Sequence, residues 1–527
     1  MSLLPFLAVT FGAGALSLLI RRPRPSAIVG IAGLVASVVL ALTIQRDEPF
    51  SLAGGSIAGS DYARLFLALG AAAGVLVAIV GVATTWSRNL PGTTLLVLGA
   101  AGFALGALDP RTAVLGATAG AVVGVLVLLT GPRSERGVIV AARELRSLVL
   151  AGVLALAAAA AIVAPATATR IDPAIVGLAY VAFAAATAIR FGAIPFNLWT
   201  ARVADAAPDV GLPLVAAWTP AAFATVALTW TATSIVPIGE QLSLERGLVV
   251  VVAAASIMLG TAFAFRDDDL AGIVGWSIVA DGGFVLLGLA AFDPAAWGPA
   301  RVWLLALVVS KTAFAGWAGA MRATFGTGRV AELGGWATRA PILAVALLAI
   351  LVAGVGWPGM AAFGARDALI GLVLDRPFAT LLLAAGLASV FYYGRLVTVG
   401  VSRASDAVDA VARSEARLPS RPPGAESPEP RSRLRRRVMT WRANRTSVAG
   451  AAVLVLGALA VAVSGGGLGV VAAAGTQPPV PAPAPVASGV PGSSGPPVGS
   501  AAPARSIGPS PSNGAGAPGA EPPTPSG

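Results

Sequence analysis

The sequence predicts an all-α polytopic membrane protein with about 14 transmembrane helices, two of them broken. Of its 527 residues, 56% are hydrophobic and only 12% are charged, and the mean hydropathy is +0.82. Apolar runs of roughly 20 residues, the length that crosses a bilayer as a helix, recur along the chain. Helices are expected because a spanning segment must satisfy its own backbone polar groups.

The first apolar run is followed by three arginines and has no cleavage signature of small residues. We therefore expect it to remain as the first helix rather than to act as a signal peptide. A short run at 366–376 does not reach the length of roughly 20 residues that crossing requires. The predicted spans lie at residues 2–20, 26–44, 62–86, 91–108, 112–131, 146–167, 173–193, 212–236, 246–265, 270–292, 298–321, 340–357, 377–400 and 447–474.

Two segments interrupt the helical pattern. Phe191–Gly211 carries two prolines and two aspartates between apolar runs, and Gly354–Gly364 is rich in glycine. In a bilayer, broken backbone is tolerated only where protein or water covers it. Transporters use such breaks to point helix ends at ions. For the first break, a plain loop between two spans is the alternative.

Composition divides the chain into a bundle at 1–400, an arginine-rich loop at 401–446, a last span at 447–474 and a tail at 475–527. The loop, with 11 arginines against five acids, is expected to be irregular apart from a short helix near 404–417. It supplies topogenic charge or, alternatively, contacts lipid headgroups. The tail contains mainly Pro, Gly, Ala and Ser and is expected to be disordered.

Arginine placement predicts the orientation. Arginines gather at Arg21–Arg24, Arg133–Arg146, Arg322–Arg339 and 401–446, and such loops usually face the cytoplasm. An even number of spans then puts both termini outside a bacterial cell membrane. The net charge of +11 is explained by these loops, so nucleic-acid binding is not expected.

The single lysine of the chain, Lys311, lies in the middle of the apolar run Val302–Met321, whereas the other 35 basic residues are arginines. A charge at this depth costs at least about 2.5–3.5 kcal/mol. A buried lysine can release its proton, but an arginine cannot. The chain has no histidine and no cysteine, so Lys311 is the basic group expected to titrate within the membrane. Drift in base composition that spared one lysine is the alternative.

Four more charged residues are candidates for a proton path. Asp281 lies in the span before that of Lys311, which makes the two a natural pair, either a proton relay or a structural salt bridge. Arg190 comes just before the first break, and Arg366 and Asp367 follow the second. Arg266–Asp269 is expected to be a solvated helix end, and Arg395 to reach the membrane interface.

Several motifs, in order, resemble the N subunit of respiratory NADH:quinone oxidoreductase, one of the antiporter-like membrane subunits shared with membrane hydrogenases and multisubunit cation/proton antiporters. The PF-x-LWT form at 195–200 is typical of the N branch. The similar stretches are Arg190–Pro208 (RFGAIPFNLWTARVADAAP), Gly260–Phe265 (GTAFAF), Trp276–Gly288 (WSIVADGGFVLLG), Leu333–Arg366 (LGGWATRAPILAVALLAILVAGVGWPGMAAFGAR) and Phe391–Arg395 (FYYGR).

This resemblance implies an inverted-repeat bundle with a central polar axis. It places Thr118 where the family has a glutamate in helix five. Arg190 and Arg366 stand at the lysines of helices seven and twelve, and Asp367 follows Arg366 as in a family variant. Lys311 matches a lysine of helix ten.

Two further departures concern helices eight and nine. Asp281 replaces the histidine of a family motif, and Trp218–Ala222 lacks the lysine that the family carries there.

The resemblance implies an N-like membrane-arm subunit that contributes to proton translocation coupled to quinone reduction, with a degraded proton path. No cofactor is expected in this chain, and redox chemistry would belong to partner subunits. The expected partners are other membrane-arm subunits and membrane lipids. The alternatives are a non-pumping structural or assembly paralogue in such a complex, and a cation/proton antiporter subunit.

Overall fold

The computed structural model describes residues 2–46, 49–52, 55–84, 89–129, 135–163, 173–197, 203–204, 206–207, 209–406, 408–409 and 430–475. All of them belong to one unit, Met1–Val480. Eleven helices in the described part are long and apolar enough to cross a bilayer. Three shorter apolar helices, Leu4–Leu19, Leu90–Gly106 and Pro341–Val355, bring the total to the fourteen that were predicted. The all-α membrane class is thereby confirmed.

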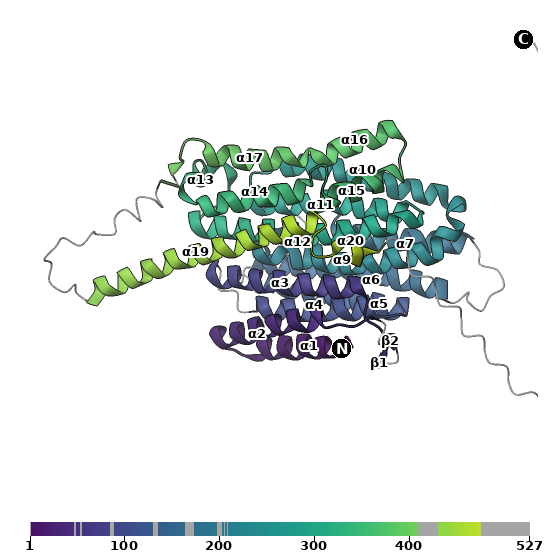
Figure 1. The fold of residues 1–527 in the computed structure, drawn as a ribbon, viewed down its shortest axis with the longest axis horizontal. Coiled ribbons are helices and arrows are strands. Elements are labelled where there is room, and N and C mark those ends of the chain that lie inside the picture. Colours follow the sequence, from purple (N-terminus) through teal and green to yellow (C-terminus); the bar gives the residue numbers. More distant parts are fainter. Residues whose placement is uncertain are drawn as a thin grey trace, which may run out of the picture. The chain divides into compact units, whose positions relative to one another are not determined.

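The first half of the unit runs back and forth through consecutive helices (Figure 1). Its elements are α1 (Leu4–Leu19), α2 (Pro23–Leu42), β1 (Phe50–Leu52), β2 (Gly55–Ile57), α3 (Asp61–Thr84), α4 (Leu90–Gly106), α5 (Pro110–Gly124), η1 (Val125–Leu129), α6 (Glu135–Val163), α7 (Pro173–Phe191), η3 (Asp209–Gly211), η4 (Leu214–Trp218), α9 (Thr219–Trp230), η5 (Thr231–Ile235) and η6 (Val236–Leu242).

The second half contains the longest buried helix, α12. Its elements are α10 (Ser243–Arg266), α11 (Leu270–Ala290), η7 (Pro294–Ala296), α12 (Trp297–Phe325), η8 (Val330–Glu332), α13 (Trp336–Arg339), α14 (Pro341–Val355), α15 (Ala361–Gly371), α16 (Arg376–Leu387), α17 (Ser389–Val401), α19 (Pro430–Ser464) and α20 (Val470–Ala474).

Three local features differ from the sequence prediction. The antiparallel hairpin of β1 and β2 was not expected. α19 begins at Pro430, so its first part lies inside the segment 401–446 that composition predicts to be a loop. The last predicted span, 447–474, is divided into α19 and α20 by a glycine-rich turn. The short helix expected near 404–417 and the tail from 476 onward lie largely or wholly outside the described residues.

Both predicted breaks interrupt helices where glycines adopt positive φ. α7 ends at Phe191, and Gly192 follows with φ +62°. α14 ends at Val355, and Gly356 and Gly359 have φ values of +58° and +94°. Residues with a Cβ rarely adopt these angles, so glycine lets the chain leave the helix at each point.

Helix α19 holds together helices that are far apart in sequence. It packs against α3 from the first half and against α12 and α14 from the second, and Figure 1 shows it crossing them. Almost every residue of α12 is buried in consequence. A charge in the middle of α12 therefore faces protein rather than lipid.

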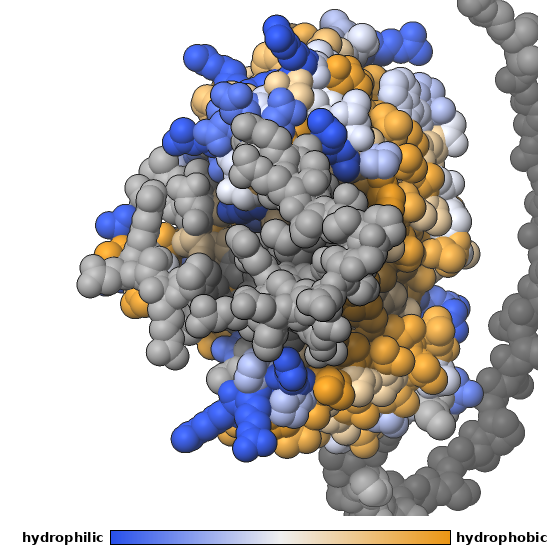
Figure 2. Space-filling view, turned by 90° about the vertical axis from the view of Figure 1, so that its left-hand side faces the viewer, coloured by the Kyte–Doolittle hydropathy of each residue, from blue (hydrophilic) through white to orange (hydrophobic). Residues whose placement is uncertain are grey.

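One end of the bundle is polar. The turn between α1 and α2, helix α13 and the start of α19 lie there (Figure 1), and Figure 2 shows hydrophilic side chains gathered at this end beside a hydrophobic flank. Arg322 joins Asp209 at 3.2 Å and Asp269 at 3.0 Å. The arginine therefore ties together segments that are distant in sequence.

The acidic end of α10 is likewise held by protein contacts. Asp269 caps α11 by accepting from the Ala271 N–H at 2.8 Å. Arg395 pairs with Asp268 at 2.9 Å and donates to the Phe265 carbonyl at 2.9 Å. Arg395 thus binds the carboxyl end of α10, where helix carbonyls carry partial negative charge.

Candidate functional site: a row of buried charges

The centre of the site is an ion pair between neighbouring helices. Lys311, in the middle of α12, places its Nζ 2.7 Å from Oδ2 of Asp281, in the middle of α11. The exposed fractions of the two side chains are 0% and 9%. Removing either partner would leave a buried charge uncompensated, which makes such a pair strongly interdependent. The structure therefore brings together the two residues that the sequence singled out.

Aromatic side chains and a second cation surround this pair. The Trp303 indole N–H donates to the Asp281 carbonyl at 3.0 Å, and Trp303 meets Phe284 edge to face at 5.2 Å. The charge of Asp281 acts on both Lys311 and Arg366. Tyr393 and Arg366 also act electrostatically on the ammonium of Lys311. Asp281 thus pairs directly with Lys311 and lies within electrostatic reach of Arg366.

Arg366 is positioned by the second helix break. It is 1% exposed and donates to the carbonyl of Val355 and, at 3.0 Å, to that of Gly356. These are unpaired carbonyls at the end of α14, where a cation is stabilised by the helix dipole. The guanidinium also lies 5.0 Å from the Trp303 ring. Arg366 is therefore a fixed positive charge beside the ion pair.

Asp367, the next residue along α15, does not join this group. Its side chain is exposed, whereas that of Arg366 is buried, because adjacent helix residues point about 100° apart. The structure separates these two sequence-predicted candidates.

Arg190 occupies the corresponding place at the first break. It lies in the last turn of α7 and is 1% exposed. Its guanidinium donates to Thr118 Oγ1 at 2.9 Å and to the Ala117 carbonyl at 3.4 Å. It also lies over the Phe223 ring at 4.2 Å. Thr118 and Arg190, 72 residues apart, therefore meet directly.

The helices that carry the two groups of charges pack together. Gly282 follows Asp281 in α11, and Phe191 follows Arg190 in α7. A methyl group at Gly282 would come within 2.8 Å of the Phe191 Cβ. Glycine thus permits close approach of α11 to the first break, and we refer to the buried charges of both groups together as the row.

Sequence reasoning missed Glu144 in this row. The predicted span began at residue 146, so Glu144 was read as part of an arginine-rich loop. The structure extends α6 back to Glu135 and leaves Glu144 only 1% exposed. An available signal was its position within an apolar-periodic stretch, with hydrophobic residues following at helical spacing.

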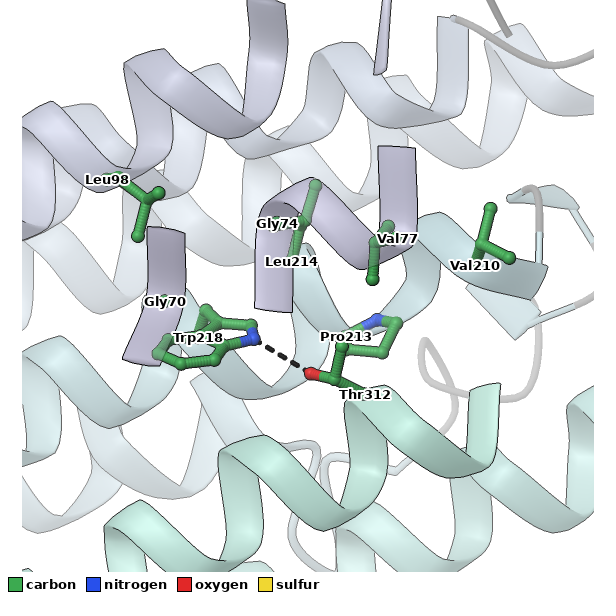
Figure 3. A pocket seen from close by; sticks show the side chains of 9 residues that line it. All are labelled: Gly70, Gly74, Val77, Leu98, Val210, Pro213, Leu214, Trp218 and Thr312. Carbon is green, nitrogen blue, oxygen red and sulfur yellow. Dashed lines mark hydrogen bonds between the residues drawn. The ribbon is translucent and has the colours of Figure 1, made fainter. Parts of the chain in front are cut away.

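Trp218 fills the region where the resemblance would place a lysine of helix eight. Its indole N–H donates to Thr312 Oγ1 at 2.9 Å, in α12 next to Lys311, as Figure 3 shows. The two residues border a small apolar cavity formed against Gly70 and Gly74 of α3. The cavity has room for about one water molecule. Any path for water toward α12 from this side is therefore narrow.

Several buried polar atoms along the row have no protein hydrogen-bond partner in the described part of the chain. They include both carboxylate oxygens of Glu144, Nε of Arg190, Nε of Arg366 and the hydroxyl of Tyr393. Buried polar groups in native proteins are nearly always satisfied by protein or by water. These atoms are therefore available to hydrogen-bond water or to exchange a proton.

The described residues contain no group of three or more carboxylates arranged to hold a metal ion. The row carries one directly paired acid, Asp281, and one acid without a direct ion pair, Glu144.

A helical membrane bundle with two broken helices and a buried row of paired charges defines the class of antiporter-like membrane proteins. More particularly, residues 148–392 match the family model described as NADH:quinone oxidoreductase/Mrp antiporter, transmembrane. This match agrees with the resemblance that the motifs carry.

Several curated relatives are named NADH-quinone oxidoreductase subunit N. The chain is 28% identical over 216 residues to NADH-quinone oxidoreductase subunit N 1 of Acidiphilium cryptum, a match that covers 40% of this chain and 45% of the relative. The chain thus spans about half the length of the first curated relatives it matches. It is also 28% identical over 435 residues to NADH-quinone oxidoreductase subunit N of Cereibacter sphaeroides, covering 78% of this chain and 92% of that one.

Solved structures share the fold. A chain of respiratory complex I from Thermus thermophilus with bound aureothin has a TM-score of 0.64 at 17% identity, covering 87% of this chain and 97% of that one. A chain of the Mrp complex from Dietzia sp. also has a TM-score of 0.64, at 20% identity, covering 89% and 95%. The fold is therefore common to both kinds of assembly.

Proposed function

We propose that the protein is an N-like membrane-arm subunit of a respiratory NADH:quinone oxidoreductase and contributes to proton translocation coupled to quinone reduction. The curated relatives named above are N subunits, and the motif at 195–200 is typical of the N branch. In this proposal, electron transfer belongs to partner subunits.

The observation that carries this proposal is the buried pair of Lys311 and Asp281 at 2.7 Å. A carboxylate at this distance holds the lysine in its charged form. If the carboxylate is drawn toward Arg366 or becomes protonated, the low-dielectric interior disfavours the unpaired ammonium of the lysine, and its proton passes to an internal water molecule. Arg366 cannot exchange a proton itself, so it acts as the fixed charge that competes for Asp281.

The orientation follows from the same arrangement. The polar end that contains Arg322 is the end at which the arginine-rich turns gather. Because arginine-rich loops remain in the cytoplasm, we assign this end to the cytoplasmic face of a bacterial cell membrane. The exposed apolar flanks would contact lipid and neighbouring membrane-arm subunits.

The test is the proton-to-electron ratio of the assembled complex in sealed vesicles. Lys311→Ala removes the amine, and Lys311→Arg keeps the charge but cannot release its proton. We expect both variants to lower the ratio, whereas Arg266→Ala, an exposed residue at the end of α10, leaves it unchanged. Full ratios in both Lys311 variants would show a non-pumping structural paralogue.

A cation/proton antiporter subunit is the second candidate, favoured by the equal fold similarity to the chain of the Mrp complex. Purification from native membranes separates the two. Copurification with hydrophilic redox subunits supports the first proposal, and purification with membrane subunits alone, together with cation-dependent proton movement, supports the second.

A further inference from the structure

Glu144 is the most deeply buried carboxylate in the described part of the chain. The exposed fraction of the whole residue is 1% for Glu144, compared with 6% for Asp281 and 8% for Asp209. The other two form ion pairs, with Lys311 at 2.7 Å and with Arg322 at 3.2 Å. Both oxygens of Glu144 are buried and receive no hydrogen bond from the described residues. A carboxylate in this setting needs a counter-ion or a proton.

The face of α6 that carries Glu144 is turned toward α5 and α7. Glu144, Leu148 and Gly152 recur every four residues and so share one helix face, and all three are buried. A methyl group at Gly152 would come within 2.7 Å of Thr118 Cγ2. α6 also packs along α7. Glu144 therefore faces the helices that supply Thr118 and Arg190.

Arg190 is the charged group that acts on Glu144, and Glu144 is the charged group that acts on Arg190. The two do not form a direct ion pair within 4.0 Å. Nε of Arg190 is likewise buried without a hydrogen-bond partner among the described residues. The two opposite charges lie within electrostatic reach of each other, and each has hydrogen-bonding atoms without a partner. One bridging water molecule could accept from Arg190 and donate to Glu144.

We propose that Glu144 is the counter-ion of Arg190 and that, with a bridging water and the Thr118 hydroxyl, it forms the acidic station of the proton path in the first half of the bundle. A carboxylate can accept and return a proton, whereas Arg190 and Thr118 cannot at neutral pH. The assignment to a proton path rests on the proposed function; the charge pairing does not.

A double-mutant cycle tests the pairing without any transport assay. The apparent midpoint of thermal unfolding is measured for the purified full chain as Glu144→Gln, Arg190→Gln and the double variant. We expect the double variant to lose at least about 2 °C less than the two single losses together. The matched control combines Arg190→Gln with Glu240→Gln, an exposed glutamate in η6, and should be additive. Additivity in the Glu144 cycle would overturn the pairing.

Moving the carboxylate from position 144 to position 118 tests whether this acidic group takes part in the proton path. Thr118→Glu combined with Glu144→Gln returns an acid to the position that already contacts Arg190 at 2.9 Å. In the assembled complex, Glu144→Gln is expected to lower the proton-to-electron ratio and the relocated variant to raise it again. If Glu144→Gln does not fold, recovery of folded protein by the relocation supports the pairing, and failure to recover contradicts it.

The proposed function and the proposal for Glu144 and Arg190 can be contradicted independently of each other. An unchanged ratio in the Lys311 variants would overturn the proposed function while leaving the thermal cycle valid. A non-additive cycle with an unchanged ratio in Glu144→Gln would keep the pairing and remove Glu144 from the proton path.

Discussion

The two helix breaks hold their arginines in different ways. At the second break, Arg366 contacts backbone carbonyls of Val355 and Gly356, and the neighbouring carboxylate, Asp281, pairs directly with Lys311. At the first break, Arg190 contacts the Thr118 hydroxyl, and the nearest carboxylate, Glu144, is not in direct contact.

This difference shows how one architecture can support two electrostatic tasks. The second half contains an acid and a releasable proton in contact, so a small displacement of Asp281 changes the proton affinity of Lys311. The first half contains a permanent cation and an acid that act on each other without a direct ion pair. We expect the second half to be the more sensitive to loss of a single charge.

The largest expected effect is that of Asp281→Asn. The buried ammonium of Lys311 would lose its counter-ion, which typically costs about 3–5 kcal/mol. Denaturation of the purified chain in detergent measures this loss. The double variant Asp281→Asn with Lys311→Met should recover most of the stability, and a double variant no more stable than the single one would contradict the direct pairing.

Gly282→Ala is expected to disturb both halves at once. Its new methyl group would come within 2.8 Å of the Phe191 Cβ beside Arg190, and overpacking of this kind costs about 1–3 kcal/mol. Thermal unfolding checks the loss. Gly364→Ala, which meets no atom within 4 Å, is the control and should be neutral or slightly stabilising because alanine favours the helix.

Thr118→Val should have a smaller effect on the first half. It removes the oxygen that accepts the 2.9 Å hydrogen bond from Arg190, and leaving a buried donor unpaired costs about 1–3 kcal/mol. Thr118→Ser keeps the hydroxyl and should retain most of the stability in the same unfolding measurement. Equal losses in both variants would show that packing of the methyl group matters as much as the hydrogen bond.

Asp367→Asn is expected to have the smallest effect. The side chain is exposed, and surface substitutions usually change stability by less than about 0.5 kcal/mol. Both the unfolding midpoint and the proton-to-electron ratio should match those of the unaltered protein. A lowered ratio would place Asp367 in the proton path despite its orientation.

The local sequence pattern was sufficient to predict the spans and the two breaks. Apolar runs of bilayer length and glycines able to adopt positive φ are properties of consecutive residues, so the apolar helices and the ends of α7 and α14 could be predicted. Glu144 could not be recognised in the same way. Its neighbours Arg143 and Arg146 suggested a loop, and only the packing of α6 against α5 and α7 buries it.

The sequence by itself determined that an amine, that of Lys311, lies in the middle of a long apolar segment, because that position depends only on the length and hydrophobicity of one helix. Only the tertiary structure decided which groups surround this amine. Asp281, Arg366 and Tyr393 come from three other helices, and their electrostatic effect on Lys311 depends on helix packing across the bundle. Hydropathy is read along the chain, but the distance between two charges is set by how separate helices are held together.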